Sequence, residues 1–357
     1  MYCSGAFTVI SVTDSEHVTS IAPVTTRLLN PGLKSITFSD CAQALFNVRV
    51  KSAARNVDVK CLFIFFLQLI QQYDVDFLKT LSLASGYYLK ILVNSRLYMP
   101  KVMGILNVTP DSFFSGSRIQ DADSLAARVE QICREGAHAI DIGACSTRPG
   151  AQPVSSDLEK ERLAWALPVV RDVNQGRCLI SVDTFRPEIA EWCIREFGAD
   201  MINDVSGGSE KMYRMVAETG VLYVLTAADS IPVGTDVISA ELSFFRSRLG
   251  MLGDCGVQVA EQVILDPGFG FGKTLDGNWM LLSEMDSLRT LELPVLVGVS
   301  RKSMAWKLLD ITPDDCLPAT IAMNMAALER GAEWIRVHDV KEGVETVRIF
   351  EKLQYIS

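Results

Sequence analysis

From about residue 90 to the end, short apolar and β-branched runs alternate with amphipathic stretches of helical length. Runs this continuously apolar are typical of strands buried on both faces of a parallel sheet. Eight strand–helix units in about 265 residues match the usual size of a (β/α)8 TIM barrel, an α/β fold. A doubly wound open sheet is less favoured, because no glycine-rich turn follows the first run. The eight runs are Val102–Val108, Ala139–Gly143, Leu179–Val182, Met201–Ile202, Val221–Leu225, Val263–Leu265, Val295–Val299 and Trp334–Val337.

The segments between these runs carry helix signals. Leu125, Val129 and Ile132 recur at spacings of four and three, which predicts one apolar face on a helix over Asp123–Glu135. Pro187 stands at the favoured first-turn position of a helix over Glu188–Phe197. Pro318 similarly opens a predicted helix over Ala319–Arg330, which Gly331 closes.

Residues 1–89 have no clear period and no motif, so they are an unassigned N-terminal extension before the barrel domain of residues 90–357. They could be a small extra domain, or could result from a start codon assigned too far upstream, with Met99 or Met103 nearer the true start. The apolar run Cys61–Ile70 falls short of the roughly 20 residues that a membrane-spanning helix needs. Residues 1–20 do not resemble a signal peptide. We therefore expect a cytoplasmic protein.

Charge and cysteine usage narrow the range of partners. The net charge of −9 argues against a nucleic-acid surface, since phosphate backbones demand basic patches. An anionic small molecule remains possible, because a few local cations can outweigh a distant acidic surface. The nine cysteines form no CxxC pair, so we expect buried thiols in a reducing compartment rather than a zinc or redox motif.

Polar residues lie at seven of the eight predicted strand ends. In TIM barrels the chemistry sits at the C-terminal ends of the strands, so these side chains should share one mouth. Taken singly, each could start a turn or cap a helix; taken together, they favour a functional site. The residues are Asn107 and Asp111; Asp141 with Ser146, Thr147 and Arg148; Asp183; Asn203 and Asp204; Asp266; Ser300, Arg301, Lys302 and Ser303; and Arg336, His338 and Asp339.

These side chains predict a ligand with two parts. Arg148, Arg336 and His338, with Thr147 and Asn107, could hold a pyrophosphate whose oxygens share a magnesium ion (Mg2+). A second set suits a flat heterocycle with several N–H groups, because a carboxylate accepts two parallel hydrogen bonds. That set comprises Asp183, Asn203 and Asp266. Gly268–Lys273 lacks Walker spacing, and we expect its glycines to allow close backbone approach to the ligand.

Seven segments, in order, resemble the dihydropteroate synthases, a family of pterin-binding enzymes. They cover nearly all of residues 90–357, and seven ordered motifs make the resemblance highly specific. The segments are MGILNVTPDSFF (Met103–Phe114), DIGACSTRPGA (Asp141–Ala151), SVDTF (Ser181–Phe185), INDVSGG (Ile202–Gly208), ILDPGFGFGK (Ile264–Lys273), GVSRKS (Gly298–Ser303) and RVHDV (Arg336–Val340).

The resemblance implies a transferase of folate biosynthesis. Such an enzyme condenses 6-hydroxymethyl-7,8-dihydropterin pyrophosphate with p-aminobenzoate, using magnesium, and commonly forms a homodimer. It further implies that Asp183, Lys302 and Arg148 are catalytic. The implied ligand-binding positions are Asn107 for magnesium; Thr147, Arg148, Arg336 and His338 for pyrophosphate; Asp183, Asn203, Asp266 and Lys302 for pterin; Pro149, Phe271 and Ser303 for p-aminobenzoate, where sulfonamides bind; and Gly298 as a further substrate contact.

Two departures from the family pattern stand out. Ala144–Cys145 replaces a frequent Gly-Glu pair, and Thr226 and Ala227 replace a His-Met pair in the fifth strand. Loss of the methionine that packs on the pterin suggests an alternative, a pterin-binding paralogue with weak or no synthase activity. Another pterin-barrel transferase, such as a methyltetrahydrofolate methyltransferase domain, and a generic phosphate-binding barrel are weaker alternatives. The first does not need STRPGA and SRKS, and the second leaves Asp183, Asn203 and Asp266 unexplained.

Overall fold

The computed structural model describes residues 7–10, 21–24, 99–108, 121–145, 154–232 and 234–354. The chain divides into two compact units, Met1–Asn94 and Ser95–Ser357. In the first, β1 (Phe7–Ile10) pairs antiparallel with β2 (Ile21–Val24). The apolar run Cys61–Ile70 lies outside the described residues. Within the described ranges, no helix has both the length and the apolar character needed to cross a bilayer.

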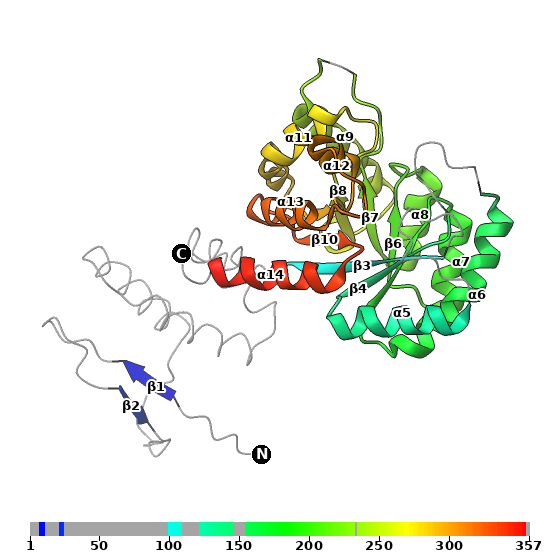
Figure 1. Cartoon of the computed structure of the whole chain (residues 1–357). Helices are drawn as coiled ribbons and strands as arrows, with labels where there is room; N and C mark the ends of the chain where they lie inside the picture. Colours follow the sequence, from blue (N-terminus) through cyan, green and yellow to red (C-terminus); the bar gives the residue numbers. More distant parts are fainter. Residues whose placement is uncertain are drawn as a thin grey trace, which may run out of the picture. The chain divides into compact units, whose positions relative to one another are not determined.

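The second unit is a (β/α)8 barrel, as predicted. Its eight parallel strands are ordered β8-β7-β6-β5-β4-β3-β10-β9. A parallel bridge between Leu265 and Val295 brings the two end strands together and closes the sheet. Figure 1 shows the helices packed around the outside of these strands. The strands are β3 (Lys101–Asn107), β4 (Ala139–Gly143), β5 (Leu179–Asp183), β6 (Met201–Asp204), β7 (Leu222–Thr226), β8 (Val263–Asp266), β9 (Leu296–Val297) and β10 (Trp334–Val337).

The helices begin and end close to the predicted positions. Asp121 caps α5 by accepting a 2.7 Å hydrogen bond from the Ser124 backbone, and Leu125, Val129 and Ile132 are buried as the spacing predicted. Pro187 opens α7, and Pro318 lies in the first turn of α13. The helices are α5 (Ala122–Glu135), α6 (Ser156–Asn174), α7 (Pro187–Phe197), α8 (Glu210–Thr219), α9 (Val237–Asp254), α10 (Val259–Gln262), α11 (Leu275–Glu284), α12 (Ser303–Leu309), α13 (Leu317–Glu329) and α14 (Val340–Gln354), with a 3-10 turn over Met285–Leu291.

One strand is much shorter than predicted. β9 covers only Leu296–Val297, not Val295–Val299. Pro294 lacks a backbone N–H, and Gly298 adds no packing side chain, so the ladder is short. Asp183 and Asp266, predicted at the ends of their strands, are the last residues of β5 and β8. They still pair in register, Asp183 with Asn203 and Thr226 with Asp266.

The strand alternation divides the barrel interior into layers. At the N-terminal end of the strands, an apolar cluster fills the interior. Because side chains on one face of a strand recur every second residue, the residues two positions further along also face inward. These residues are mostly polar, so the second layer is the first level of the barrel interior that carries functional groups able to bind a ligand. The apolar layer contains Met103, Ala139, Met201, Val224, Ile264, Leu296 and Trp334; the next contains Ile105, Asp141, Ser181, Asn203, Thr226, Asp266, Gly298 and Arg336.

Candidate active site

Asp141 lies at the centre of a buried polar network that joins four strands. Arg336 donates from Nε to Asp141 Oδ2 at 2.7 Å and from its second nitrogen to Asp183 Oδ2 at 2.9 Å. The same Asp141 accepts from Ser181 Oγ at 2.6 Å and from Asn203 Nδ2 at 2.9 Å. One guanidinium therefore holds two acids in place across the mouth of the barrel, meaning the C-terminal ends of its strands.

Asp141 was predicted at a strand end, but no role of its own was predicted for it. A signal was present, because Asp141 is a fully buried acid in a five-residue strand that is otherwise apolar. A buried carboxylate is costly unless it is paired and hydrogen-bonded, so such a residue implies nearby partners. The sequence does not say which ones, since Arg336 is 195 positions away.

Asp183 stands at the end of β5 in a strongly acidic setting. Burial raises its pKa to about 7; Arg336 opposes this, and Asp141, Asp204 and Asp266 add to it. Gly143 lies beside it, and a Cβ there would be 3.3 Å from Asn107 Oδ1 and 3.9 Å from Asp183 Oδ2. Because Gly143 has no side chain, the Asn107 and Asp183 side chains can both lie close to it.

Asp266 and Lys302 form the opposite side of the mouth. Asp266 accepts from the Gly268 backbone at 2.8 Å and from Thr226 Oγ1 at 3.4 Å, and burial raises its pKa. Lys302 Nζ donates to the Phe269 carbonyl and lies 4.8 Å from the centre of the Phe271 ring. Burial lowers the pKa of Lys302 to about 8, although Asp266 pulls it upward. The Lys302 ammonium therefore lies near the aromatic ring of Phe271 and interacts electrostatically with the Asp266 carboxylate.

The divergent segment after β7 is held by the loop after β8. Lys273, whose side chain is fully buried, forms a 3.0 Å ion pair with Glu241 of α9 and also donates to the Ala227 carbonyl at 3.0 Å. A Cβ on Gly268 would lie 2.2 Å from the Ala227 carbonyl oxygen, and one on Gly272 would lie 2.5 Å from that of Asp229. Both glycines also have positive φ, so only glycine fits there. The two loops therefore pack backbone against backbone.

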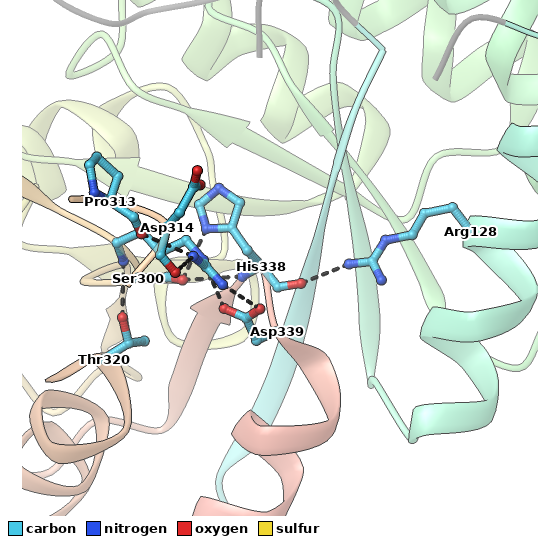
Figure 2. A network of polar contacts seen from close by, with 8 residues as sticks. Arg128, Ser300, Pro313, Asp314, Thr320, His338 and Asp339 are labelled. Carbon is cyan, nitrogen blue, oxygen red and sulfur yellow. Dashed lines mark hydrogen bonds and ion pairs between the residues drawn. The ribbon is translucent and has the colours of Figure 1, made fainter. Parts of the chain in front are cut away.

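The ends of β9 and β10 are joined by consecutive residue pairs, drawn in Figure 2. Ser300 Oγ lies 2.9 Å from His338 Nδ1 and accepts from the His338 backbone N–H at 3.2 Å. The next residue, Arg301, makes a two-pronged ion pair with Asp339, with distances of 2.9 and 3.0 Å. Arg301 has a φ of 55°, a left-handed conformation that such fixed contacts must sustain.

The structure gathers most predicted site residues but regroups them. Arg336, assigned with His338 to a pyrophosphate, makes its described ion pairs with Asp141 and Asp183. Gly298 lies next to it, with 3.9 Å between a Cβ on Gly298 and Arg336 Cβ. Ser303 is half-buried at the start of α12. Thr147, Arg148 and Pro149 lie outside the described residues.

The donors present fit a magnesium ion that is held mainly by water and substrate phosphate. In the described part of the chain, no group of three or more His, Cys, Asp or Glu side chains forms a protein-built metal site. Magnesium usually retains waters and takes one or two protein oxygens together with substrate phosphates. The half-buried Asn107 amide oxygen, beside the bare backbone of Gly143, fits such a minimal site.

The arrangement favours binding of a flat, N–H-rich molecule. Asn203 is 1% exposed, and its Oδ1 has no hydrogen-bond partner within the described part of the chain. Buried polar atoms are nearly always hydrogen-bonded, so this acceptor calls for a donor from a ligand. Asp183 and Asp266 add carboxylate acceptors, and Lys302 adds a donor. The described strand ends thus combine acceptors, an ammonium and a guanidinium.

Comparisons with known proteins agree with this geometry. Residues 103–338 match the family described as pterin binding enzyme. The chain is 39% identical over 264 residues to a dihydropteroate synthase of Escherichia coli K12, covering 71% of this chain and 91% of that protein. It is similar to the Yersinia pestis dihydropteroate synthase solved with a sulfonamide drug (TM-score 0.68, 37% identity, 72% and 96% coverage). It also resembles the Xanthomonas albilineans enzyme with 4-aminobenzoic acid (TM-score 0.65, 35% identity, 72% and 94% coverage).

Proposed function

The chain belongs to the pterin-binding enzymes and is a dihydropteroate synthase, and from this premise we propose how its strand ends carry out the reaction. It is a transferase of folate biosynthesis, joining 6-hydroxymethyl-7,8-dihydropterin pyrophosphate to p-aminobenzoate. The observation that carries the proposed division of roles is the Arg336 bridge between Asp141 and Asp183. It supports one continuous mouth in which both substrates meet.

The pterin ring is proposed to bind between Asp183, Asn203 and Asp266. The unpaired Asn203 oxygen and the two carboxylates would accept the N–H groups along one edge of the ring. Lys302 would donate to a ring acceptor from the opposite side. Its lowered pKa, about 8, still leaves it mostly protonated near neutral pH. Burial of these groups supports tight orientation, since few alternative partners compete for them.

The pyrophosphate is proposed to lie toward His338 and Arg336, with Thr147 and Arg148 completing the group. Asn107 would hold a magnesium ion together with the phosphate oxygens. When bound, the metal would act as a Lewis acid for the leaving group. His338 and the arginines would donate hydrogen bonds to the charge that develops on the departing oxygen.

The proposed reaction needs no protein nucleophile. The bond between the pterin methylene carbon and the pyrophosphate oxygen breaks, and both electrons leave with pyrophosphate. The amine nitrogen of p-aminobenzoate forms the new bond to that carbon and loses one proton, which the released pyrophosphate or solvent water accepts. Asp183, when ionised, would stabilise positive charge at the pterin methylene. Positioning and electrostatics would supply most of the rate enhancement.

The aminobenzoate is proposed to lie against Phe271, Pro149 and Ser303. Lys302 lies 4.8 Å from the Phe271 ring, which would orient one aromatic wall of this pocket. Sulfonamides, as aminobenzoate analogues, would compete at the same position. A matched test compares Phe271→Ala with Phe269→Ala, since Phe269 is buried in the core. Phe271→Ala should raise the aminobenzoate KM selectively, whereas loss of folded protein is expected only at Phe269.

Direct assay tests the activity. Purified chain with dihydropterin pyrophosphate, p-aminobenzoate and magnesium should release pyrophosphate and form dihydropteroate. Pterin binding without turnover would instead favour the paralogue with an impaired β7 segment. Complementation of a strain that lacks the synthase, with the full chain and with a version starting at Met99, would also show whether residues 1–98 are needed.

We further propose a cytoplasmic homodimer. An apolar groove of about 270 Å³ between α11, α12 and α13 supports a second copy as the partner, because Leu308 and Leu309 at its edge are 65% and 52% exposed. Sedimentation of the wild type and of a Leu308→Asp, Leu309→Asp variant would test it. A monomeric wild type at micromolar concentration would rule out this interface.

A further inference from the structure

Ser300 is buried at the junction of β9 and β10, where it contacts only His338 among the described hydrogen-bond partners. The residue is 5% exposed. Its Oγ accepts the His338 backbone N–H at 3.2 Å and lies 2.9 Å from His338 Nδ1. Figure 2 shows the serine and the imidazole facing each other across this junction.

The direction of the second hydrogen bond follows from the hydroxyl proton. A serine hydroxyl has one proton to donate, and a buried proton without an acceptor costs about 1–3 kcal/mol. Within the described residues, Nδ1 is the acceptor in reach of Ser300 Oγ. The hydroxyl therefore donates to Nδ1. A neutral imidazole that accepts at Nδ1 carries its own proton on Nε2.

The surrounding contacts keep the two residues in this alignment. Arg128 of α5 donates to the His338 carbonyl at 2.7 Å, so both backbone groups of His338 are fixed. Beside them, the Arg301–Asp339 ion pair joins the same two strand ends. Thr320 Oγ1 accepts from the Arg301 backbone at 3.1 Å. The Ser300 hydroxyl thus contacts the imidazole of His338, a residue whose backbone is already held by hydrogen bonds.

We propose that Ser300 is a positioning residue that sets the tautomer of His338, so that a neutral imidazole presents an Nε2–H donor to the leaving pyrophosphate. The inference rests on the proposed binding of pyrophosphate at His338. The ionised oxygens of a pyrophosphate have no proton to donate, so the opposite tautomer would direct a lone pair at an anion. Ser300 itself does not touch the reacting atoms.

The test uses the full chain labelled with ¹⁵N-histidine. Only three histidines are present, so His338→Gln assigns the His338 ring signals by subtraction. Without substrates, and at a pH where the ring is neutral, the spectrum should place the proton on Nε2. A proton on Nδ1 in the wild type would overturn the inference. An inactive wild type with the proton on Nε2 would instead contradict the proposed function.

Three variants separate tautomer control from a general structural effect. Ser300→Ala should change the His338 ring signals and weaken pyrophosphate binding, measured by calorimetry with magnesium, by about tenfold. Ser300→Thr keeps the hydroxyl and should restore both. Thr320→Ala removes a hydroxyl from the same network without touching His338, so the ring signals should persist. Equal effects of Thr320→Ala and Ser300→Ala, or unchanged signals in Ser300→Ala, would refute the role of Ser300.

Discussion

The two ends of the barrel interior differ in what they contribute. Near the N-terminal ends of the strands, Met103, Leu296 and Trp334 belong to an apolar layer that is almost fully buried. Two residues further along the same strands stand Ile105, Gly298 and Arg336, and all five remaining strands carry a polar or charged residue at this level. Apolar burial stabilises the fold at one end, whereas buried charges at the other are tolerated for chemistry. The two ends should therefore respond oppositely to mutation.

The largest effect is expected at Lys302. Lys302→Met removes the buried ammonium while leaving an apolar side chain of similar length. Turnover efficiency, kcat/KM, should fall by about 10²–10³-fold, as for loss of an oriented charged donor. The free energy of unfolding should hold or rise, because burial already disfavours the charge. Lys307→Met, at an exposed lysine of α12, is the matched control. A Lys302 variant as active as this control would contradict the role.

The apolar layer should show the reverse pattern. Met103→Ala opens a cavity in the closed interior, and the free energy of unfolding should fall by about 2–5 kcal/mol in chemical denaturation. Substrate KM values, measured where the variant remains folded, should stay near wild type. Met251→Ala, at a methionine 38% exposed on α9, should change stability by less than about 0.5 kcal/mol. A large KM change in Met103→Ala would show that the two layers are not separable.

The destabilising effect of burying Asp183 at the polar end of the barrel should appear as a pH dependence of the free energy of unfolding. The pKa of Asp183 is about 7 in the folded state and near 3.8 in the unfolded chain. Between pH 3.8 and about pH 7, the folded protein therefore binds more protons than the unfolded chain. Stability from this group therefore falls as pH rises through that window. Asp183→Asn does not titrate, so its stability relative to wild type should increase between about pH 4 and pH 7. A constant difference across this range would be evidence against the raised pKa.

The smallest effect is expected at Thr226, where the chain departs from its family. Its hydroxyl reaches Asp266 Oδ2 at 3.4 Å, a distance at the limit of a hydrogen bond. Thr226→Val should raise the pterin pyrophosphate KM by about twofold, equivalent to roughly 0.5 kcal/mol. Thr226→Ser keeps the hydroxyl and should match wild type. A tenfold loss would mean that β7 contributes directly to pterin binding.

Local patterns predicted the barrel and most of the positions around its mouth. The periodicity of strands and the preference of Pro187 and Gly331 for helix ends depend only on neighbouring residues. They can therefore be recognised in the sequence without knowledge of the fold. The extent of β9 was predicted wrongly, because an apolar run does not reveal where Pro294 and Gly298 interrupt the ladder. Thr147, Arg148 and Pro149 stay predictions from the motif.

By itself, the sequence determined the eight strands, the order of the motifs and which strand ends are polar. Only the tertiary structure decided which polar side chains form hydrogen bonds and ion pairs with each other. Asp141 became the centre of the network, Arg336 joined it to Asp183, and Ser300 met His338. Such partners are 38 to 195 residues apart, and their contact depends on strand register and barrel closure. The spacing of residues along a strand predicts on which face of the sheet a side chain lies. It does not predict which distant side chain will contact it there.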